Sequence, residues 1–381
     1  MFSSIFSTSP PVDPTAPTFH PVSSQQGKEA FGQLEAKDTE WLCPGGFSTE
    51  TQVFYTIGDD GTFLICQIIH SAVGVWYPTI QFTCKVYDPK SKDKTWRRSS
   101  KADEFSVTHK SAPDSEYPES YTIRANLSTD LQISLEVSRP KLIPGFKIGQ
   151  GEKGGYSYFG PDPLKPEAIS IQGPGMFIHA IQGMRPNLVA SSWNFANFQS
   201  PQQGGVSAIQ MEFKTLENYG RKGSTSGGVV VSIGSLVVGD KLAAVTAETH
   251  WPDEESSPDA AIKSRAVHLK PYSDTETGYQ APSELAFEWA APSLLAESPG
   301  AYAAKVQVDV GDNEHPKGLV EKVDVLAEIP RVIKLAVNYV AGTKPYIYQW
   351  LNPATLTLIG PEAGQSAEIE GTLYAEATFI S

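Results

Sequence analysis

Apolar and polar residues alternate along much of the chain, and this alternation predicts a mainly β protein. Residues 79–87 and 131–137 place apolar side chains at every second position, which is typical of antiparallel strands with one buried face. Residues 62–70 form a nearly continuous apolar run, which indicates a strand buried on both faces. The alternation resumes at residues 209–213 and recurs up to a strand-like segment at 368–380. We therefore expect antiparallel sheets or barrels in both halves of the chain.

One segment near the C-terminus has a helical rather than a β pattern. Its apolar residues follow the i, i+3, i+4, i+7 spacing of one helix face, and they are Ile329, Val332, Ile333, Ala336, Val337 and Val340. Pro330 stands in the first turn and Gly342 follows the last turn, as is typical of helix ends. The pattern predicts an amphipathic helix that packs over a sheet or a barrel end.

Residues 179–200, HAIQGMRPNLVASSWNFANFQS, fit neither pattern. They lie near the middle of the chain between β-like segments, so we interpret them as an irregular, partly buried connection between two β-rich halves. One hypothesis is that five of them line a ligand cavity where the halves meet, because ligand sites favour domain interfaces: His179, Met184, Trp193, Phe195 and Phe198. The other interpretation is that the aromatic side chains are ordinary packed core.

A chain of 381 residues is too long for one compact core, which predicts two folded domains. Its hydrophobic content of 40% and aromatic content of 10% are those of a globular protein rather than a disordered one. We expect a proline-rich N-terminal segment at residues 1–35, an N-terminal domain at 36–205 and a C-terminal domain at 206–381.

The N-terminal segment begins with a short apolar cluster. Phe2, Ile5 and Phe6 fall on one face of a short helix, and five prolines between residues 10 and 21 prevent its continuation. A membrane interface stabilises such an apolar face, so these three residues predict a small membrane-binding foot on an extended linker. A disordered tail with a few chance apolar residues is the alternative.

The formal net charge of -13 argues against nucleic acid as a partner, because phosphate binding needs clustered positive charge. The exception is the basic segment at residues 90–101, which has six basic residues and one acidic residue. We interpret it as a solvated loop between strands, with contact to anionic lipid head groups as the alternative. The three cysteines have no metal-ligand spacing and indicate reduced thiols in a reducing compartment.

No motif in the chain forms a catalytic or metal-binding constellation. The seven histidines lack metal-ligand spacing, and His70 and His179 have the strand-like, apolar surroundings of core histidines with satisfied hydrogen bonds. Residues 149–154 match G-x-G-x-x-G, but no helix pattern follows, so they predict a glycine-rich loop. No run is long enough to span a bilayer and no secretion signal is present. We therefore expect a cytoplasmic protein that needs no metal, nucleotide or other cofactor.

Several sequence blocks resemble the survival factor 1 family of fungal ceramide-binding proteins. They are ETQVFY (50–55), QIIHS (67–71), YFGPDP (158–163), HAIQGMRP and SWNFANFQS within 179–200, EKVDVLAEIP and AGTKPYIYQW within 321–350, and GTLYAEATFIS (371–381). The resemblance covers the chain from about residue 38 to its end. None of the blocks is a catalytic signature, but their order along the chain makes the similarity specific.

This resemblance implies two consecutive lipocalin-like β-barrel or sandwich domains, a hydrophobic cavity for ceramide, and no enzymatic activity. It also implies non-vesicular transfer of ceramide from the endoplasmic reticulum to the Golgi, and survival under oxidative stress. The expected location is the cytoplasm, the cytosolic faces of Golgi and endoplasmic reticulum membranes, and also the nucleus. Family members attach to membranes through an N-terminal amphipathic helix with an acetylated methionine, whereas the apolar face of this chain is brief and interrupted by prolines.

Two further functions remain open from the residues alone. The same scaffold resembles fungal pericyclases and hydratases, so the alternative is an enzyme that acts on a hydrophobic small molecule, because fold does not determine function. The remaining alternative is a structural or stress-signalling partner protein that binds no ligand.

Overall fold

The computed structural model describes most of the chain beyond residue 30. The described residues are 31–43, 48–71, 79–90, 96–101, 105–128, 131–141, 143, 145–148, 175–183, 189–217, 219, 228–252, 254, 261–325, 344–362 and 364–380. Several expectations fall outside them: the foot with Phe2, Ile5 and Phe6, the helix at 329–340, Met184 and the glycine-rich loop at 149–154.

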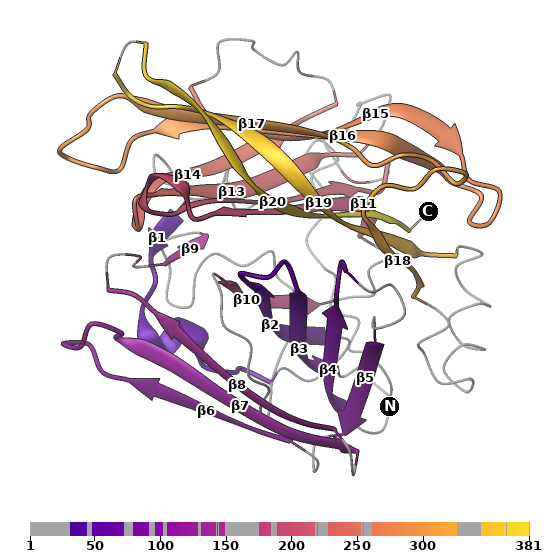
Figure 1. The fold of residues 1–381 in the computed structure, drawn as a ribbon, viewed down its shortest axis with the longest axis horizontal. Helices are drawn as coiled ribbons and strands as arrows, with labels where there is room; N and C mark the ends of the chain where they lie inside the picture. The colour runs from indigo at the N-terminus through magenta and orange to yellow at the C-terminus, as the bar shows by residue number, and fades with distance from the viewer. Residues whose placement is uncertain are drawn as a thin grey trace, which may run out of the picture.

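The described residues form a mainly β protein with two halves, as the alternation predicts (Figure 1). We call residues 31–183 the N-half and residues 189–380 the C-half. The helical elements in the described part are two short 3-10 turns, η1 (Ala36–Thr39) and η5 (Gln202–Gly204). Neither is long and apolar enough to cross a membrane.

A five-stranded sheet packs against a three-stranded sheet in the N-half (Figure 1). The larger sheet has the order β10-β2-β3-β4-β5, with β2 at Ser48–Ile57, β3 at Phe63–Ser71, β4 at Thr79–Tyr87, β5 at Trp96–Lys101 and β10 at Gly175–Gly183. The smaller sheet contains β6 (Phe105–Ser111), β7 (Glu119–Ser128) and β8 (Leu131–Arg139), while β1 (Phe31–Gln33) pairs with β9 (Phe146–Ile148). Apolar side chains from both main sheets form a single core.

The C-half is one strongly curved sheet of ten strands. Its order is β14-β13-β12-β11-β20-β19-β17-β16-β15, with β11 at Ala190–Ser200, β12 at Val206–Thr215, β13 at Val230–Val238, β14 at Lys241–His250, β15 at Lys263–Ser273, β16 at Gln280–Pro292, β17 at Ala301–Asp309, β19 at Tyr346–Ile359 and β20 at Ser366–Phe379. The tenth strand, β18 (Leu319–Asp324), pairs with β19. Most strands pair with the strand that comes before or after them in the sequence. This is the up-and-down order of a lipocalin-like barrel.

Carboxylates rather than a strand ladder join the two edges of the C-half sheet. Glu248 of β14 accepts the Ser264 amide of β15 at 2.8 Å and pairs with Arg265, with 2.7 Å between Nη2 and Oε1. Glu212 of β12 accepts the Ala266 amide at 3.0 Å. Two edge amides of β15, those of Ser264 and Ala266, are therefore bonded without a strand beside them, which leaves less of the sheet edge open to pairing.

The middle segment, expected to be an irregular connection, contains two regular strands. His179 lies in β10 of the N-half sheet, and residues 190–200 form β11 of the C-half sheet. The irregular pattern has a physical reason, because β11 is buried on both faces: Phe195 stacks on Tyr55 of the N-half, whereas Phe198 packs inside the C-half. A strand with two apolar faces has no polar–apolar alternation. The sheets change over between residues 183 and 190, ahead of the expected boundary at 205.

The basic segment at residues 90–101 also differs in part from the expected loop. Trp96–Lys101 form β5, which pairs with β4 at the edge of the larger N-half sheet. Basic residues are common on edge strands, where their charge opposes pairing with another chain. A run of basic residues is therefore compatible with an edge strand at this position.

Aromatic stacking and a partly buried ion pair join the two halves. Tyr374 of β20 stacks on Phe63 of β3 with 4.3 Å between ring centroids. Lys85 of β4 donates to Glu321 at 2.5 Å and to Gln349 at 2.7 Å, both in the C-half. Because ring packing and charge pairing both connect N-half strands to C-half strands, the halves share an interface with its own core.

Candidate functional site

Buried polar side chains gather at one end of the N-half core. On β2, Glu50 is 0% exposed and Gln52 is 1% exposed. Both share a strand face with Phe54, because side chains two positions apart point the same way. Phe54 packs in the core between the two sheets. The two polar side chains therefore point into the same interior.

Two histidines on the neighbouring strands face these β2 residues. His70 of β3 lies opposite Glu50, and His179 of β10 lies opposite Gln52. The His179 ring has Nε2 at 2.7 Å from a Glu50 oxygen and Nδ1 at 3.0 Å from the Asp38 carbonyl. Both ring nitrogens of His179 therefore have a hydrogen-bond partner.

The Glu50 carboxylate is held by the chain that follows η1. It accepts the Leu42 amide at 3.0 Å and the Cys43 amide at 2.8 Å. Hydrogen bonds from backbone amides stabilise a buried carboxylate in its charged form. Residues 38–43 thus fix Glu50 and, through it, His179.

The smaller sheet contributes a third histidine and a tyrosine from the opposite side. His109 of β6 stacks on Tyr121 of β7 with 4.6 Å between centroids, and Tyr121 stacks on Phe177 of β10 at 4.9 Å. Phe177 is two residues before His179 and shares its strand face. These ring contacts bring the two sheets together at the polar end of the core.

We call Glu50, Gln52, His70, His109, Tyr121 and His179 the polar cluster. Four of its atoms are buried with no hydrogen-bond partner among the described residues: Gln52 Oε1, His70 Nδ1, His109 Nε2 and the Tyr121 hydroxyl oxygen. The Tyr121 hydroxyl lies beside Thr39 without a hydrogen bond of normal geometry. Most buried polar atoms in proteins are bonded, and each unbonded one costs about 1–3 kcal/mol. Several such atoms in one place indicate a site for the polar groups of a ligand.

Burial also determines the charge of the cluster. It lowers the pKa of His70, against the opposing charge of Glu50, and it lowers the pKa of His109, against Glu119 and Glu40. Burial raises the pKa of Tyr121 to about 12. At neutral pH both histidines are therefore uncharged and the tyrosine keeps its proton. The unpartnered atoms are neutral donors and acceptors.

Apolar side chains fill the rest of the same interior. They come from both sheets, and the fully or nearly fully buried ones include Leu64, Cys66, Ile68, Phe82, Cys84, Phe105, Val107, Ile123 and Leu135. Cys66 and Cys84 are free thiols on neighbouring strands, with 3.6 Å between their sulfur atoms. The N-half interior thus has a polar end and an apolar end, like an amphiphilic molecule.

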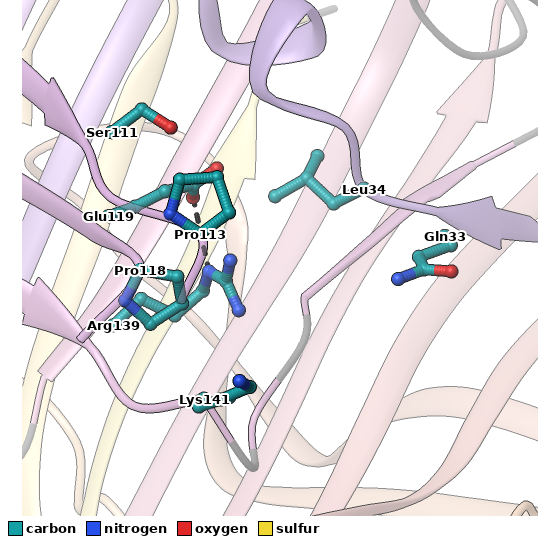
Figure 2. A pocket seen from close by; sticks show the side chains of 8 residues that line it. All are labelled: Gln33, Leu34, Ser111, Pro113, Pro118, Glu119, Arg139 and Lys141. Carbon is teal, nitrogen blue, oxygen red and sulfur yellow. Dashed lines mark hydrogen bonds and ion pairs between the residues drawn. The ribbon is translucent and has the colours of Figure 1, made fainter. Parts of the chain in front are cut away.

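A pocket of about 310 Å³ lies at the polar end (Figure 2). Its wall includes Ser111 and Glu119, the next residues on their strand face after His109 and Tyr121. Glu119 pairs with Arg139 at 3.1 Å, and Figure 2 shows this contact beside the pocket. The volume is at the lower end of the range of about 300–1,000 Å³ for small-molecule sites. The pocket therefore lies on the side of the N-half where the polar cluster is, although no member of the cluster lines it.

The structure does not bring the expected cavity residues into one place. His179 belongs to the polar cluster, Phe195 to the interface of the halves, and Phe198 to the C-half core. Trp193 is half-buried on the same strand face as Phe195. His70 also differs from a satisfied core histidine, since one ring nitrogen lacks a partner.

Sequence reasoning missed Glu50, Gln52 and His109. A usable signal was present in β2, where the side chains of Glu50 and Gln52 lie on the same strand face as Phe54. Polar residues on the apolar face of a strand indicate a buried polar site. For a metal site the residues do not fit, because no group of three or more His, Cys, Asp or Glu in the described part is placed to hold an ion.

Known proteins similar to this chain point to one family. The family model described as the Svf1 family matches residues 2–169 and 164–381. The ceramide-binding protein svf1 of Schizosaccharomyces pombe is 33% identical over 94% of this chain and 93% of its own length. The ceramide-binding protein SVF1 of Yarrowia lipolytica is 30% identical over 96% of this chain and 95% of its own length.

Among solved structures, the crystal structure of CghA has a TM-score of 0.51 and 11% identity, and the match covers 92% of this chain and 98% of that one. At this identity the likeness concerns the fold alone, and it agrees with two β-rich halves. The near-complete match to the family model and the identity to full-length relatives lead to one conclusion: this chain belongs to the Svf1 family.

Proposed function

We propose that this protein binds ceramide in the interior of its N-half and is not an enzyme. The observation that carries the proposal is the polar cluster at one end of an apolar interior, in a chain whose relatives are named ceramide-binding proteins. Ceramide has a small head with an amide and hydroxyl groups and two long hydrocarbon chains. The two ends of the interior match these two parts.

The energetics of extraction favour such an interior. Each CH₂ group gains about 0.8 kcal/mol on leaving water, so the chains need an apolar environment throughout transfer. The amide and hydroxyl groups of the head must keep hydrogen bonds, because burial without them costs several kcal/mol. An apolar core with buried, unpartnered polar atoms meets both requirements.

The proposal extends to transport between membranes. The family resemblance implies transfer from the endoplasmic reticulum to the Golgi, and a role in survival under oxidative stress. We place the protein in the cytoplasm and at the cytosolic faces of these membranes, with the N-terminal foot as the attachment.

Native mass spectrometry of the full chain purified from ceramide-producing cells tests the proposed function. We expect a single ceramide to co-purify with each chain. A bound polyketide or terpene-like product would instead support the enzyme hypothesis. A chain that is always empty, even after incubation with ceramide-containing vesicles, would contradict the proposal.

Replacing both Phe2 and Phe6 with aspartate should release the protein from membranes. Each aromatic side chain contributes roughly 1.5–3 kcal/mol at full burial and less at a wet interface, so partition onto vesicles should fall at least about tenfold. Flotation of the variant with vesicles measures this, and Phe19→Asp in the linker is the matched control. Ceramide binding by the purified protein should not change. Unchanged flotation would exclude the foot and direct attention to the basic segment at residues 90–101.

A further inference from the structure

We infer that the polar cluster holds the ligand's head group and selects a neutral head with hydroxyl or amide hydrogens against a phosphorylated one. This inference rests on the proposed function, since it concerns which ceramide-like lipid the same interior accepts. It assigns the head to the N-half, and it names Gln52 as a residue that binds the head.

The first argument is the hydrogen-bonding capacity of Gln52. Its side-chain nitrogen donates to the Thr39 carbonyl at 3.0 Å, while its oxygen has no partner among the described residues. An amide oxygen can only accept, so the ligand must donate a hydrogen to it. The neutral rings of His70 and His109 each offer one more unpartnered nitrogen. A head with hydroxyl and amide hydrogens supplies the required donors.

The second argument is the charge around the cluster. Glu50 is a buried carboxylate inside it, and Glu119 lies beside His109. A phosphate monoester adds a charge of about −1.5 to −2 and would lie close to both carboxylates.

Nearby cations do not offset this repulsion. Arg139 pairs with Glu119 and also donates to the Ile143 carbonyl at 3.0 Å. Lys147 lies 2.9 Å from a Glu35 oxygen and 3.0 Å from an Asp38 oxygen. Since both cations are already paired, neither is free to pair with a phosphate, and burying the phosphate beside the carboxylates is strongly unfavourable.

The third argument is the contrast with the C-half interior. Both interiors contain packed apolar side chains, and those of the C-half include Phe198, Phe287, Trp289, Tyr348 and Trp350. The buried hydroxyls of the C-half bond to one another, with Ser232 and Thr246 at 2.9 and 3.0 Å from Ser264. Of the described side chains that point into that interior, Gln210 alone has an unpartnered buried atom. A single such atom does not make a head-group site, whereas the N-half interior has several in one place.

Gln210 provides a matched control for Gln52. Both side chains are 1% exposed, both donate from Nε2 to a backbone carbonyl at 3.0 Å, and both leave Oε1 unpartnered, while Gln210 Nε2 also donates to the Ser264 hydroxyl at 3.2 Å. Replacement of either by leucine removes the same groups from a similar environment. A difference in ligand binding between the two variants therefore shows in which half the ligand head lies, because both variants lose the same kind of side chain.

The experiment measures binding of the full chain to phosphatidylcholine vesicles that contain either ceramide or ceramide phosphorylated on its terminal hydroxyl. Wild type should prefer the unphosphorylated lipid at least about a hundredfold. Gln52→Leu should weaken ceramide binding about tenfold, as for one lost hydrogen bond, whereas Gln210→Leu should change it less than about twofold. Thermal unfolding shows whether each variant folds. If Gln52→Leu does not fold, His70→Phe is used in its place.

The outcomes separate this inference from the proposed function. If wild type binds neither lipid, ceramide binding itself is wrong. If wild type binds both lipids equally, the selection by charge is wrong although ceramide binding stands. If Gln210→Leu loses binding and Gln52→Leu does not, the head lies in the C-half and the assignment is overturned.

Discussion

Replacing Trp289 with alanine should lower the free energy of unfolding of the C-half by about 3–5 kcal/mol. The side chain is 1% exposed and packs with Phe287 in the centre of that core. Its indole nitrogen donates to the Ile209 carbonyl at 2.8 Å. Alanine would leave a large cavity and remove this hydrogen bond, and a whole domain has only about 5–15 kcal/mol of stability.

The room for this indole depends on a neighbouring glycine. A Cβ atom on Gly234 would lie 2.9 Å from the Trp289 nitrogen and 2.5 Å from the Ile209 oxygen. Gly234 therefore permits the close approach of a bulky ring to the strands β12 and β13.

Urea unfolding of Trp289→Ala, followed by circular dichroism, measures the loss. Leu294→Ala is the control, because Leu294 is 43% exposed and surface substitutions change stability by about 0.5 kcal/mol or less. The loss of stability for Trp289→Phe should lie between those of Trp289→Ala and Leu294→Ala, since phenylalanine retains a ring but not the hydrogen bond. A loss below about 1 kcal/mol for Trp289→Ala would contradict the packing described here.

Replacing Lys85 with methionine should destabilise the interface of the halves by about 3 kcal/mol. The Lys85 side chain is 7% exposed and pairs with Glu321. Its charge also acts on Glu376, which accepts hydrogen bonds from Gln349 at 2.7 Å and from Tyr374. Without the Lys85 cation, the carboxylates of Glu321 and Glu376 remain at the interface with less positive charge to stabilise them. The loss is less than for a fully buried pair because Glu321 is 36% exposed.

The effect of Lys85→Met should depend on pH with a defined sign. Burial raises the pKa of Glu376, and the Lys85 charge opposes this rise, so the variant should have a still higher pKa there. A carboxyl group with a raised pKa contributes full stability below its unfolded pKa, and the contribution is lost as pH rises through the folded pKa. The variant should therefore lose more stability near pH 8 than near pH 5.

Denaturant unfolding at the two pH values checks this prediction. Adding Glu376→Gln to Lys85→Met should restore part of the stability at the higher pH, because the uncompensated charge is gone. Lys305→Met is the control, since the Lys305 side chain is 54% exposed and its pair with Glu288 is worth about 0–1 kcal/mol. Equal losses at both pH values would show that Glu376 does not respond to Lys85.

Strands that have one buried face were predicted well from the pattern of residues. The alternation at 79–87 corresponds to β4, and that at 131–137 lies within β8. The pattern failed where a strand has two buried faces, as in β11, and where an edge strand is strongly basic, as in β5. In both cases the surroundings of the strand, rather than its own sequence, decide which residues are tolerated.

The candidate site was harder to predict than the strands. His179 stood out in the sequence, but its partner Glu50 lies 129 positions away. No local spacing indicates that these two residues form a pair, or that His109 from the other sheet lies at the same end of the core.

The sequence by itself determined the strands with one buried face, the absence of a nucleic-acid charge pattern and the resemblance to a family, because each depends on local periodicity, composition or ordered blocks of residues. The tertiary structure alone decided which polar side chains share an interior. Strand register and the packing of one sheet on another bring Glu50, His109 and His179 together. Burial then lowers the pKa of His109 and leaves a nitrogen of its ring without a partner. These are properties of the surroundings, which the order of residues specifies only through the completed fold.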